Sequence, residues 1–389
     1  MSSKFEILVS AEFRSTVEAN LEADPVKIAL DKRLANASEV ATAVKYLRRA
    51  RTKLPSYYAA RAIIPPLAFE QSSSEDTASA RDYEGALAID LTCGLGVDSL
   101  YLSKRFEKVI AIEADRELAE IARYNFGLLG AANIEVVCAK AESFIENCRA
   151  EADLVYCDPD RRGLKGRKLI LPEDCTPDVT ALMPQLKEIA RKVVIKASPM
   201  FDIAEARRLF GEHTRVEVVS LHGECKEVLI EVDDSIRQAG VKATVIGRGS
   251  VEYPFGRRKP ERASAPDPCF AKYLIAPDVA LQKARVAVDY LTERGVYIES
   301  DNSFGFAMQP VDALCRTLPI ISVSKLNCKK FSSELKKREI SRVEIMLRDF
   351  PMSAEKILKQ LGVSEGNSAK LAFTTIKGVP VVVELEKIS

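Results

Sequence analysis

Apolar and polar positions alternate with two different periods along the middle of the chain. From residue 86 onward, short apolar runs typical of strands are separated by longer segments with the period of a helix. Strands that alternate with helices form a parallel, doubly wound α/β sheet, and ligands bind such a sheet at the carboxyl ends of its strands. The predicted strands are 86–90, 108–113, 133–138, 152–157 and 192–196, and the predicted helices are 97–106, 116–129 and 181–190.

The chain before this region is helical in pattern through about residue 61. Asp24 and Pro25 mark a helix start, and Ser73 or Ser74 is placed to cap a further helix that runs toward Tyr83. The second half of the helical segment is basic. These cations either form a solvated helix face, which is the commoner use of such a run, or contact nucleic acid. They are Lys45, Arg48, Arg49, Arg51 and Lys53.

Paired strands follow the alternating region. Two apolar runs at 215–221 and 226–232 are joined by the sequence from His222 to Cys225, which is a hairpin signal. Because no helix separates these two runs, we expect them to give the sheet an antiparallel edge.

The pattern breaks up in the last third of the chain. A stretch rich in Gly, Pro and Arg at 247–268 predicts a linker, and a small α/β unit follows around 280–306. The last module, from about Pro319, is rich in lysine and arginine and ends in an apolar strand at 379–385.

Composition describes an ordinary protein of more than one domain. The chain has 389 residues, which is more than one hydrophobic core usually serves, and its net charge of +1 carries no overall nucleic-acid signal. Nine cysteines without a CxxC pair, and only two histidines, argue against a metal site. Without a charged-then-apolar leader or an apolar run long enough to span a bilayer, we expect a cytoplasmic protein with reduced thiols.

The turn after the first predicted strand has the chemistry of a nucleoside site. Asp90 ends that strand, and Gly94 and Gly96 precede a helix, so a ligand can approach the main chain closely. Glu113 ends the next strand, where a carboxylate can accept hydrogen bonds from both ribose hydroxyls. A dinucleotide site would use a similar layout, but its third glycine position is Ser99 here. S-adenosylmethionine, which has no pyrophosphate, fits this turn better.

The fourth predicted strand ends in Asp158-Pro159-Asp160-Arg161-Arg162. An acidic residue followed by proline places a rigid, non-helical backbone beside the bound cofactor. The segment resembles the Asp/Asn-Pro-Pro-Tyr or Asp-Pro-Pro-Arg motif of base-modifying methyltransferases. In those enzymes, a side-chain oxygen and a backbone carbonyl orient an amino or imino group for attack on the methyl carbon.

Five motifs together resemble the class I methyltransferases that carry a C-terminal THUMP-like domain, a bacterial family whose substrate is inferred to be RNA. The resemblance runs nearly end to end. The Asp158 motif is the most specific of the five, and the glycine turn is the least. The motifs are Gln71-Ser-Ser-Ser-Glu-Asp-Thr-Ala78, Asp90-Leu-Thr-Cys-Gly-Leu-Gly-Val-Asp98, Asp158-Pro-Asp-Arg-Arg162, Lys196-Ala-Ser-Pro-Met200 with Asp202, and Gly223-Glu-Cys-Lys-Glu227.

The resemblance implies a set of cofactor-binding residues. Asp90, Gly94 and Gly96 would surround the methionine part of S-adenosylmethionine, with Asp98 and Asp158 also in the site, and Glu113 would hold the ribose. The adenine amino group would meet Ala141 or Glu142, because Lys140 replaces the acidic residue that is usual in that motif.

The resemblance also implies catalytic and substrate-binding residues. Asp158, Asp160 and Arg161 are the predicted catalytic residues. Arg161, Arg162 and Lys196 are predicted to hold the substrate, since guanidinium planes stack on bases and pair with phosphates. Lys165, Arg167 and Lys168 either extend this basic lip or belong to a solvated loop.

Three further residues carry open alternatives. Asp202 is either substrate-facing or a helix cap. Cys157 lies inside an apolar strand, where a buried, inert thiol is expected. Cys225 has His222 and Lys226 nearby, which would lower its pKa, but its spacing does not match the nucleophile motif of uridine methyltransferases.

The predicted function is base methylation in structured RNA, tRNA or rRNA. Basic residues in the N-terminal helices and the last module would hold the RNA while the central sheet acts. The alternatives are a small-molecule or protein methyltransferase, and an RNA-binding protein with a vestigial cofactor pocket. The predicted division is an N-terminal helical domain at 1–80, a Rossmann-like class I methyltransferase domain at 81–246, a linker with a small ferredoxin-like unit at 247–318, and a THUMP-like domain at 319–389.

Overall fold

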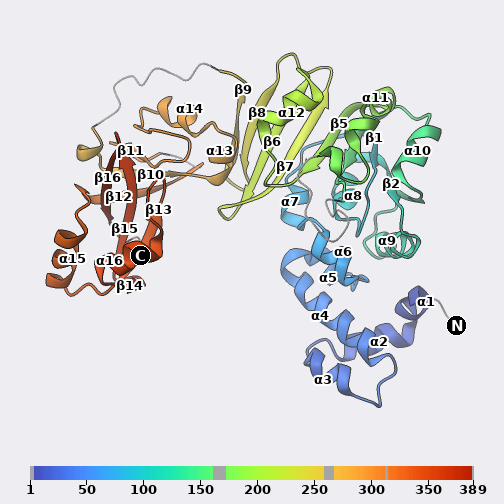
Figure 1. Ribbon diagram of the computed structural model, residues 1–389. Coiled ribbons are helices and arrows are strands. Elements are labelled where there is room, and N and C mark those ends of the chain that lie inside the picture. Colours follow the sequence, from blue (N-terminus) through green and yellow to red (C-terminus); the bar gives the residue numbers. More distant parts are fainter. Residues whose placement is uncertain (1–3, 161–171, 258–266, 312–313, 388–389) are drawn as a thin grey trace. The chain divides into compact units, whose positions relative to one another are not determined.

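A computed structural model describes residues 4–160, 172–257, 267–311 and 314–387 (Figure 1). The contacts gather the chain into two compact units. The first is Met1–Val216 with Glu227–Ala239, and the second is Glu217–Lys226 with Gly240–Ser389. The four-part division drawn from the sequence stays a prediction.

The described part of the first unit begins with a series of helices, and side chains cap the starts of some of them. The Asp24 carboxylate accepts a hydrogen bond from the Val26 N–H, with Pro25 at the first helical position, and the Ser74 hydroxyl accepts one from the Thr77 N–H. The predicted helix starts at both places are confirmed. The helices are α1 (Lys4–Val9), α2 (Ala11–Ala19), α3 (Pro25–Leu30), α4 (Ala37–Lys53), α5 (Pro55–Ala59), α6 (Pro66–Gln71) and α7 (Glu75–Ser79).

The first unit continues as a Rossmann-like sheet, which confirms the predicted fold class. Its strands lie in the order β3-β2-β1-β4-β5-β7; the first five are parallel, and β7 is antiparallel to β5. The strands are β1 (Gly85–Asp90), β2 (Phe106–Glu113), β3 (Ile134–Cys138), β4 (Ala152–Cys157), β5 (Ala190–Ala197) and β7 (Glu224–Asp233). The helices between them are α8 (Val97–Leu102), α9 (Arg116–Leu128), α10 (Ala141–Asn147), α11 (Val179–Ile189) and α12 (Ile203–Phe210).

Two predicted elements differ from the structure. The stretch at 247–268, predicted as a linker, contains a strand at Gly249–Pro254. The helix expected at 97–106 ends at Leu102, and Phe106 starts strand β2 instead, where its backbone pairs with Gly85 of β1. The Phe106 side chain is buried in the sheet core, so tertiary packing overrides the helical pattern at this point.

The predicted hairpin is present as β6 (Thr214–Leu221) followed by β7. Its two-residue turn consists of His222 and Gly223, which both adopt left-handed backbone angles, with φ values of 53° and 78°. Such angles match the twist of the flanking strands.

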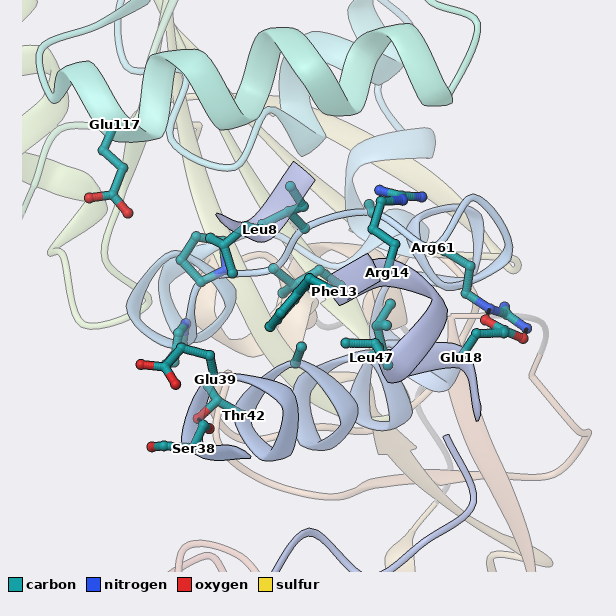
Figure 2. Close-up of a pocket in the computed structure, with 17 residues that line it drawn as sticks. Leu8, Phe13, Arg14, Glu18, Ser38, Glu39, Thr42, Leu47, Arg61 and Glu117 are labelled. Carbon is teal, nitrogen blue, oxygen red and sulfur yellow. Dashed lines mark hydrogen bonds and ion pairs between the residues drawn. The ribbon is translucent and has the colours of Figure 1, made fainter. Parts of the chain in front are cut away.

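The N-terminal helices cover a cavity of about 460 Å³ (Figure 2). In Figure 2, Arg61 pairs with Glu18 at one end of this cavity, and Glu39 lies beside Thr42 at the other. Apolar side chains line the space between them, with Phe13 near the middle. Glu117 of α9 also lines the cavity.

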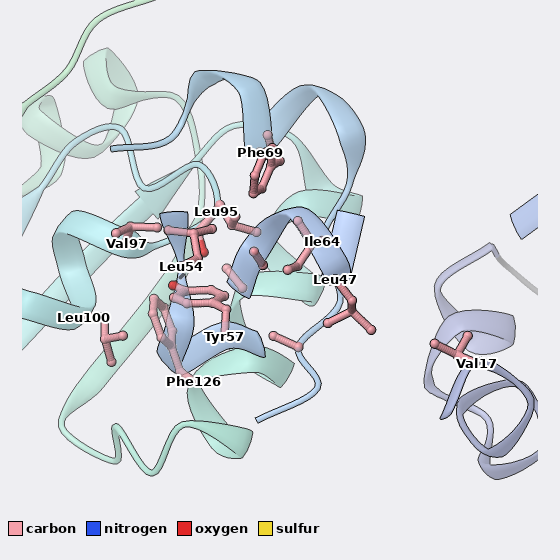
Figure 3. Close-up of a cluster of buried hydrophobic side chains, with 14 of the residues drawn as sticks. Val17, Leu47, Leu54, Tyr57, Ile64, Phe69, Leu95, Val97, Leu100 and Phe126 are labelled. Carbon is pink, nitrogen blue, oxygen red and sulfur yellow. Dashed lines mark hydrogen bonds between the residues drawn. The ribbon is translucent and has the colours of Figure 1, made fainter. Parts of the chain in front are cut away.

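The helices and the sheet share one hydrophobic core (Figure 3). Tyr57 of α5 is fully buried, and its hydroxyl donates to the Leu95 carbonyl at 3.1 Å, inside the turn that follows β1. Phe126 of α9 packs in the same cluster. The side-chain amide of Asn125 donates to the Ile63 carbonyl at 2.8 Å and accepts from the Ile63 N–H at 2.9 Å. The N-terminal helices therefore pack against the turn that follows β1 and against α9.

The second unit contains a hairpin of β8 (Gly240–Val245) and β9 (Gly249–Pro254) and a seven-stranded sheet in the order β11-β10-β12-β16-β15-β13-β14. The sheet strands are β10 (Tyr273–Pro277), β11 (Gly305–Ala307), β12 (Cys315–Lys325), β13 (Arg342–Leu347), β14 (Ser364–Glu365), β15 (Ala369–Ile376) and β16 (Val379–Leu385). The helices are α13 (Val279–Lys283), α14 (Ala287–Thr292), α15 (Cys328–Lys337) and α16 (Ala354–Leu361). Among the described residues, no helix is both long and apolar enough to cross a membrane.

Candidate active site

Asp90 ends β1 with its side chain buried, only 1% exposed. One carboxylate oxygen accepts a hydrogen bond from the Thr92 N–H at 3.0 Å, and the other accepts one from the Ser99 hydroxyl at 2.5 Å. Burial raises the pKa of Asp90 to about 7, and the nearby carboxylates of Asp98 and Asp158 act in the same direction. Ser99, which stands where a dinucleotide site has its third glycine, thus holds Asp90 in place.

The two glycines of the turn serve different purposes. Both have left-handed backbone angles, with φ of 56° at Gly94 and 89° at Gly96. Apart from its chain neighbours, no atom of the described residues would lie closer to a Cβ on Gly94 than the Thr92 carbonyl at 4.0 Å, so these residues leave the space beside this glycine open. A Cβ on Gly96 would lie 2.4 Å from the Phe126 ring, so packing against α9 requires glycine there.

Glu113 at the end of β2 holds the glycine turn directly. Its carboxylate accepts hydrogen bonds from the Gly94 N–H and the Asp115 N–H, both at 2.8 Å. Carboxylate oxygens have further lone pairs, so the same group can also accept from two ribose hydroxyls. Beyond the neighbouring strand, Ala141 is buried at the start of α10, and Glu142 is half-buried in its first turn. The residues at these strand ends therefore fit a nucleoside cofactor.

Asp158 follows β4 and is tied to the same turn. Its backbone N–H donates to the Thr92 hydroxyl at 2.7 Å, and the Leu91 N–H donates to the Tyr156 carbonyl at 2.9 Å. These two bonds join the loop after β1 to the loop after β4. Asp160 is exposed, and its backbone pairs with Thr176.

Lys196 near the end of β5 contacts Asp158 through its ammonium group. The Lys196 Nζ lies 2.6 Å from the Asp158 Oδ2 and 2.9 Å from the Ser73 hydroxyl. It lies 3.9 Å from Asp98 and 4.0 Å from Glu227. Burial by itself would lower the pKa of Lys196, but the three carboxylates around it raise that pKa above its ordinary value.

Arg81 completes the surroundings of Lys196. Its guanidinium is buried, donates to Asp98 and Glu227, and lies over the Tyr156 ring at 5.0 Å. Burial raises the pKa of Glu227. At Asp98, Arg81 and Lys196 outweigh burial and lower the pKa. We call Arg81, Asp98, Asp158, Lys196 and Glu227 the buried ion-pair cluster.

Known proteins resemble the chain in both units. Residues 315–387 match the family model described as THUMP domain-like. An uncharacterised S-adenosylmethionine-dependent methyltransferase from Mycobacterium tuberculosis is 22% identical over 339 residues, covering 85% of this chain and 90% of the relative. A tRNA/tmRNA (uracil-C(5))-methyltransferase from Nautilia profundicola is 32% identical over 140 residues, covering 32% of this chain and 38% of the relative.

A solved structure from Porphyromonas gingivalis, of a protein described as a methyltransferase, shares the whole fold. It has a TM-score of 0.84 and 24% identity, and the alignment covers 100% of both chains. In fold and in these similarities, the chain resembles the class I S-adenosylmethionine-dependent methyltransferases, and its C-terminal part matches a THUMP-like domain.

The fold brings most of the predicted site residues to the carboxyl edge of the first sheet. Asp90 and Glu113 end β1 and β2, Asp158 directly follows the neighbouring strand β4, and the glycine turn lies between them. The predicted residues Arg161 and Arg162, and the basic residues Lys165, Arg167 and Lys168, lie outside the described residues. None of the described site residues lines the cavity under the N-terminal helices.

Two predicted residues have surroundings that the sequence did not indicate. Lys196 was expected to hold substrate, but its side chain is only 7% exposed and contacts Asp158 and Ser73. Asp98 was expected to contact the cofactor, but its carboxylate accepts hydrogen bonds from Arg81 and Ser73. Asp202 caps α12 by accepting from the Ala204 N–H, so the helix-cap interpretation is confirmed.

Two residues beside the candidate site were not predicted from the sequence, namely Arg81 and Glu227, and Arg81 contacts both Asp98 and Glu227. Glu227 lies in a motif that carried the family resemblance, but no role was drawn from it. For Glu227, the available signal was a charged residue at the start of a run of buried strand positions, because such a residue needs a partner in the core.

The buried cysteines near the strand ends are poor nucleophiles. Burial raises the pKa of both Cys93 and Cys157 well above the ordinary value for a thiol. The expectation of a buried thiol at Cys157 is confirmed, since its side chain is fully buried.

The basic residues of α4 contact neighbouring groups of the first unit. Arg49 pairs with Glu70, Arg51 pairs with Glu22, and Arg48 donates to the Ala23 carbonyl. Lys53 donates to the Phe69 carbonyl, and burial lowers the pKa of Lys53 to about 8. In helix α15, the lysines Lys329, Lys330, Lys336 and Lys337 are exposed, as are Arg48, Arg49 and Arg51 of α4. Lys330 lies 4.0 Å from Glu334.

Proposed function

We propose that this methyltransferase modifies a base in structured RNA, tRNA or rRNA, and that Asp158 orients the nucleophilic nitrogen of that base. The observation that carries the proposal is the position of Asp158. It follows β4 at the carboxyl edge of the sheet, and the Thr92 hydroxyl joins it to the cofactor turn at 2.7 Å. A base nitrogen held by Asp158 would therefore lie beside the methyl donor.

The work of the chain in this reaction is positioning. S-adenosylmethionine supplies a methyl group on a sulfonium, which is already a good leaving group. Asp90, Gly94 and Gly96 would hold its methionine part, Glu113 its ribose, and Ala141 or Glu142 its adenine. Asp158 would accept a hydrogen bond from the amino or imino group, which aligns the nitrogen lone pair with the methyl carbon. Asp160 and Arg161 would support the nucleotide, with Arg162 at the same lip.

A nitrogen acceptor agrees better with the site than the C5 position of uracil. Methylation at C5 requires a thiolate to attack the ring first, and Cys93 and Cys157 at the strand ends are buried with raised pKa values. Cys225 is the remaining candidate from the sequence. Retained activity in a Cys225→Ala protein would remove it.

The RNA assignment is supported by the second unit and by the relatives. The THUMP-like domain at 315–387 and the similarity to tRNA/tmRNA methyltransferases both point to RNA. The exposed lysines of α15 suit phosphate contacts. We place the protein in the cytoplasm, consistent with its nine cysteines, which form no disulfide in the structure as described.

The test compares modified nucleosides by mass spectrometry in tRNA and rRNA from cells with and without this protein. One methylated nucleoside should disappear without the protein and return with the wild-type chain. It should not return with Asp158→Ala. The exposed carboxylate Asp234, replaced in Asp234→Ala, serves as the matched control and should restore the nucleoside. Full restoration by Asp158→Ala would exclude the role given to Asp158, and an unchanged nucleoside profile would exclude these RNAs as substrates.

A further inference from the structure

We propose that Lys196 is a positioning residue for Asp158, and that the other members of the buried ion-pair cluster, Arg81, Asp98 and Glu227, hold the Lys196 ammonium group in place. This inference rests on the proposed role of Asp158 and adds the residues that make that role possible. Lys196 would act through Asp158 and would not touch the nucleotide.

The burial of the two side chains separates their roles. The Asp158 side chain is 18% exposed, whereas that of Lys196 is 7% exposed, so Asp158 is the member of the pair that reaches the surface. The Lys196 ammonium donates to Asp158 from the protein interior at 2.6 Å. A carboxylate that accepts such a bond from behind loses the freedom to rotate, and its orientation toward a substrate is set before the substrate arrives.

Lys196 is itself held from several sides. The Ser73 hydroxyl accepts from Lys196 at 2.9 Å and donates to Asp98 at 2.9 Å. Arg81 bridges Asp98 and Glu227, with 2.9 Å to the Glu227 Oε2. These contacts join three segments of the chain. They are the residues that flank α7, the α8 helix and strand β7.

The energetics of burial favour a role beyond stability. Besides Asp158, the cluster contains two cations and two carboxylates whose side chains are at most 12% exposed, and removing such ions from water is costly. Apolar residues of similar volume often stabilise a core equally well or better. The cluster lies at the strand ends, where its Lys196 ammonium contacts Asp158. The orientation that this contact gives to the Asp158 carboxylate explains why ions are buried here despite the cost.

The test uses the full-length chain, tritiated S-adenosylmethionine, and bulk tRNA and rRNA from cells that lack the protein. Lys196→Met removes the ammonium and keeps much of the side-chain volume. We expect the maximal rate to fall about 100-fold, as for a reacting group displaced by about 1 Å. The calorimetric Kd for S-adenosylmethionine should stay the same within error, because Lys196 does not contact the cofactor. Lys196→Arg, which keeps the charge, should recover part of the lost rate.

Lys192 offers a matched control, because it lies on the same strand and also pairs with carboxylates, at 3.1 Å from Glu231. Lys192→Met should leave the rate unchanged. The double variant with Lys196→Met and Asp158→Ala should be no slower than Asp158→Ala alone, because Lys196 would act only through Asp158.

If Lys196→Met does not fold, Ser73→Ala tests the inference in its place, because this variant removes one Lys196 contact and leaves every charge in place. Ser73→Ala should lower the maximal rate without changing the Kd for S-adenosylmethionine. Wild-type rates in Lys196→Met or Ser73→Ala, or an additive double variant, would overturn the inference while the proposed function stood. An unchanged rate in Asp158→Ala, or no transfer by the wild type to these RNAs, would instead overturn the proposed function.

Discussion

The Asp90 carboxyl group has a protonation state that depends on the fold. Burial raises its pKa from the ordinary 3.8 to about 7. The folded state therefore retains a proton that the unfolded chain releases near pH 4, and this part of the stability is lost as the pH rises toward 7. Hydrogen bonds from Thr92 and Ser99 oppose the shift without cancelling it.

Asp90→Asn should isolate this effect. Between pH 5 and pH 7, the wild-type free energy of unfolding should fall relative to that of Asp90→Asn by about 1.4 kcal/mol per pH unit, or less where other groups couple to Asp90. Chemical denaturation of both proteins at each pH measures the difference. A difference that stays constant with pH would show that Asp90 titrates normally in the folded protein.

Gly96 offers a second prediction at this scale. Gly96→Ala combines a left-handed backbone with a Cβ 2.4 Å from Phe126, so it should destabilise the protein by about 2–4 kcal/mol. Gly130→Ala is the matched control, because φ is 71° there and, apart from its chain neighbours, no atom of the part of the chain that the structure describes lies within 4 Å of its added Cβ; we expect about 1–2 kcal/mol. Denaturant unfolding measures both variants, and equal losses would contradict the packing explanation.

At the scale of elements, Glu75 links the helices to the methyltransferase sheet. Its buried carboxylate accepts from the Ser56 N–H at 2.8 Å at the start of α5, and from the Tyr101 hydroxyl at 2.8 Å in α8. One residue of α7 thus caps a second helix and contacts a third. Within the motif from Gln71 to Ala78, Glu75 therefore has a structural role, whereas Ser73 belongs to the candidate site.

Glu75→Ala should leave a buried N–H group of α5 without its acceptor. The expected loss in the free energy of unfolding is about 3 kcal/mol. The exposed neighbour Asp76 is the control, and Asp76→Ala should change stability by less than about 0.5 kcal/mol. Chemical denaturation distinguishes the two. A small loss in Glu75→Ala would mean that water or another group replaces the carboxylate.

At the scale of the whole molecule, the THUMP-like domain is part of a larger sheet. Strand β12 pairs with both β10 and β16, and one hydrophobic cluster includes Leu274, Phe306 and Val383. A truncation at Pro319 would cut through β12 and expose this core. Surface substitutions are therefore a better test of the RNA role of the domain than deletion.

Replacing Lys329, Lys330, Lys336 and Lys337 of α15 with glutamine should weaken RNA binding. If all four contact phosphates, the slope of log affinity against log salt should decrease by about 3. A control replaces four exposed lysines of the first unit with glutamine, namely Lys27, Lys32, Lys104 and Lys108. Filter binding to the bulk RNA compares the two proteins, and equal effects would mean that only net charge matters. S-adenosylmethionine binding should be unchanged in both.

Helix α10 was not predicted from the sequence, which by itself determined the alternation of the other strands and helices of the sheet, the helix starts at Asp24 and Ser74, and the glycine turn. These features depend on neighbouring residues, so periodicity and capping residues predict them. The tertiary structure decided that Lys196 is buried against Asp158, that Gly96 faces Phe126, and that Arg81 joins Asp98 to Glu227. Arg81 and Glu227 are 146 residues apart, and they meet only because β7 is inserted beside β5. Local patterns carry no information about such a pairing.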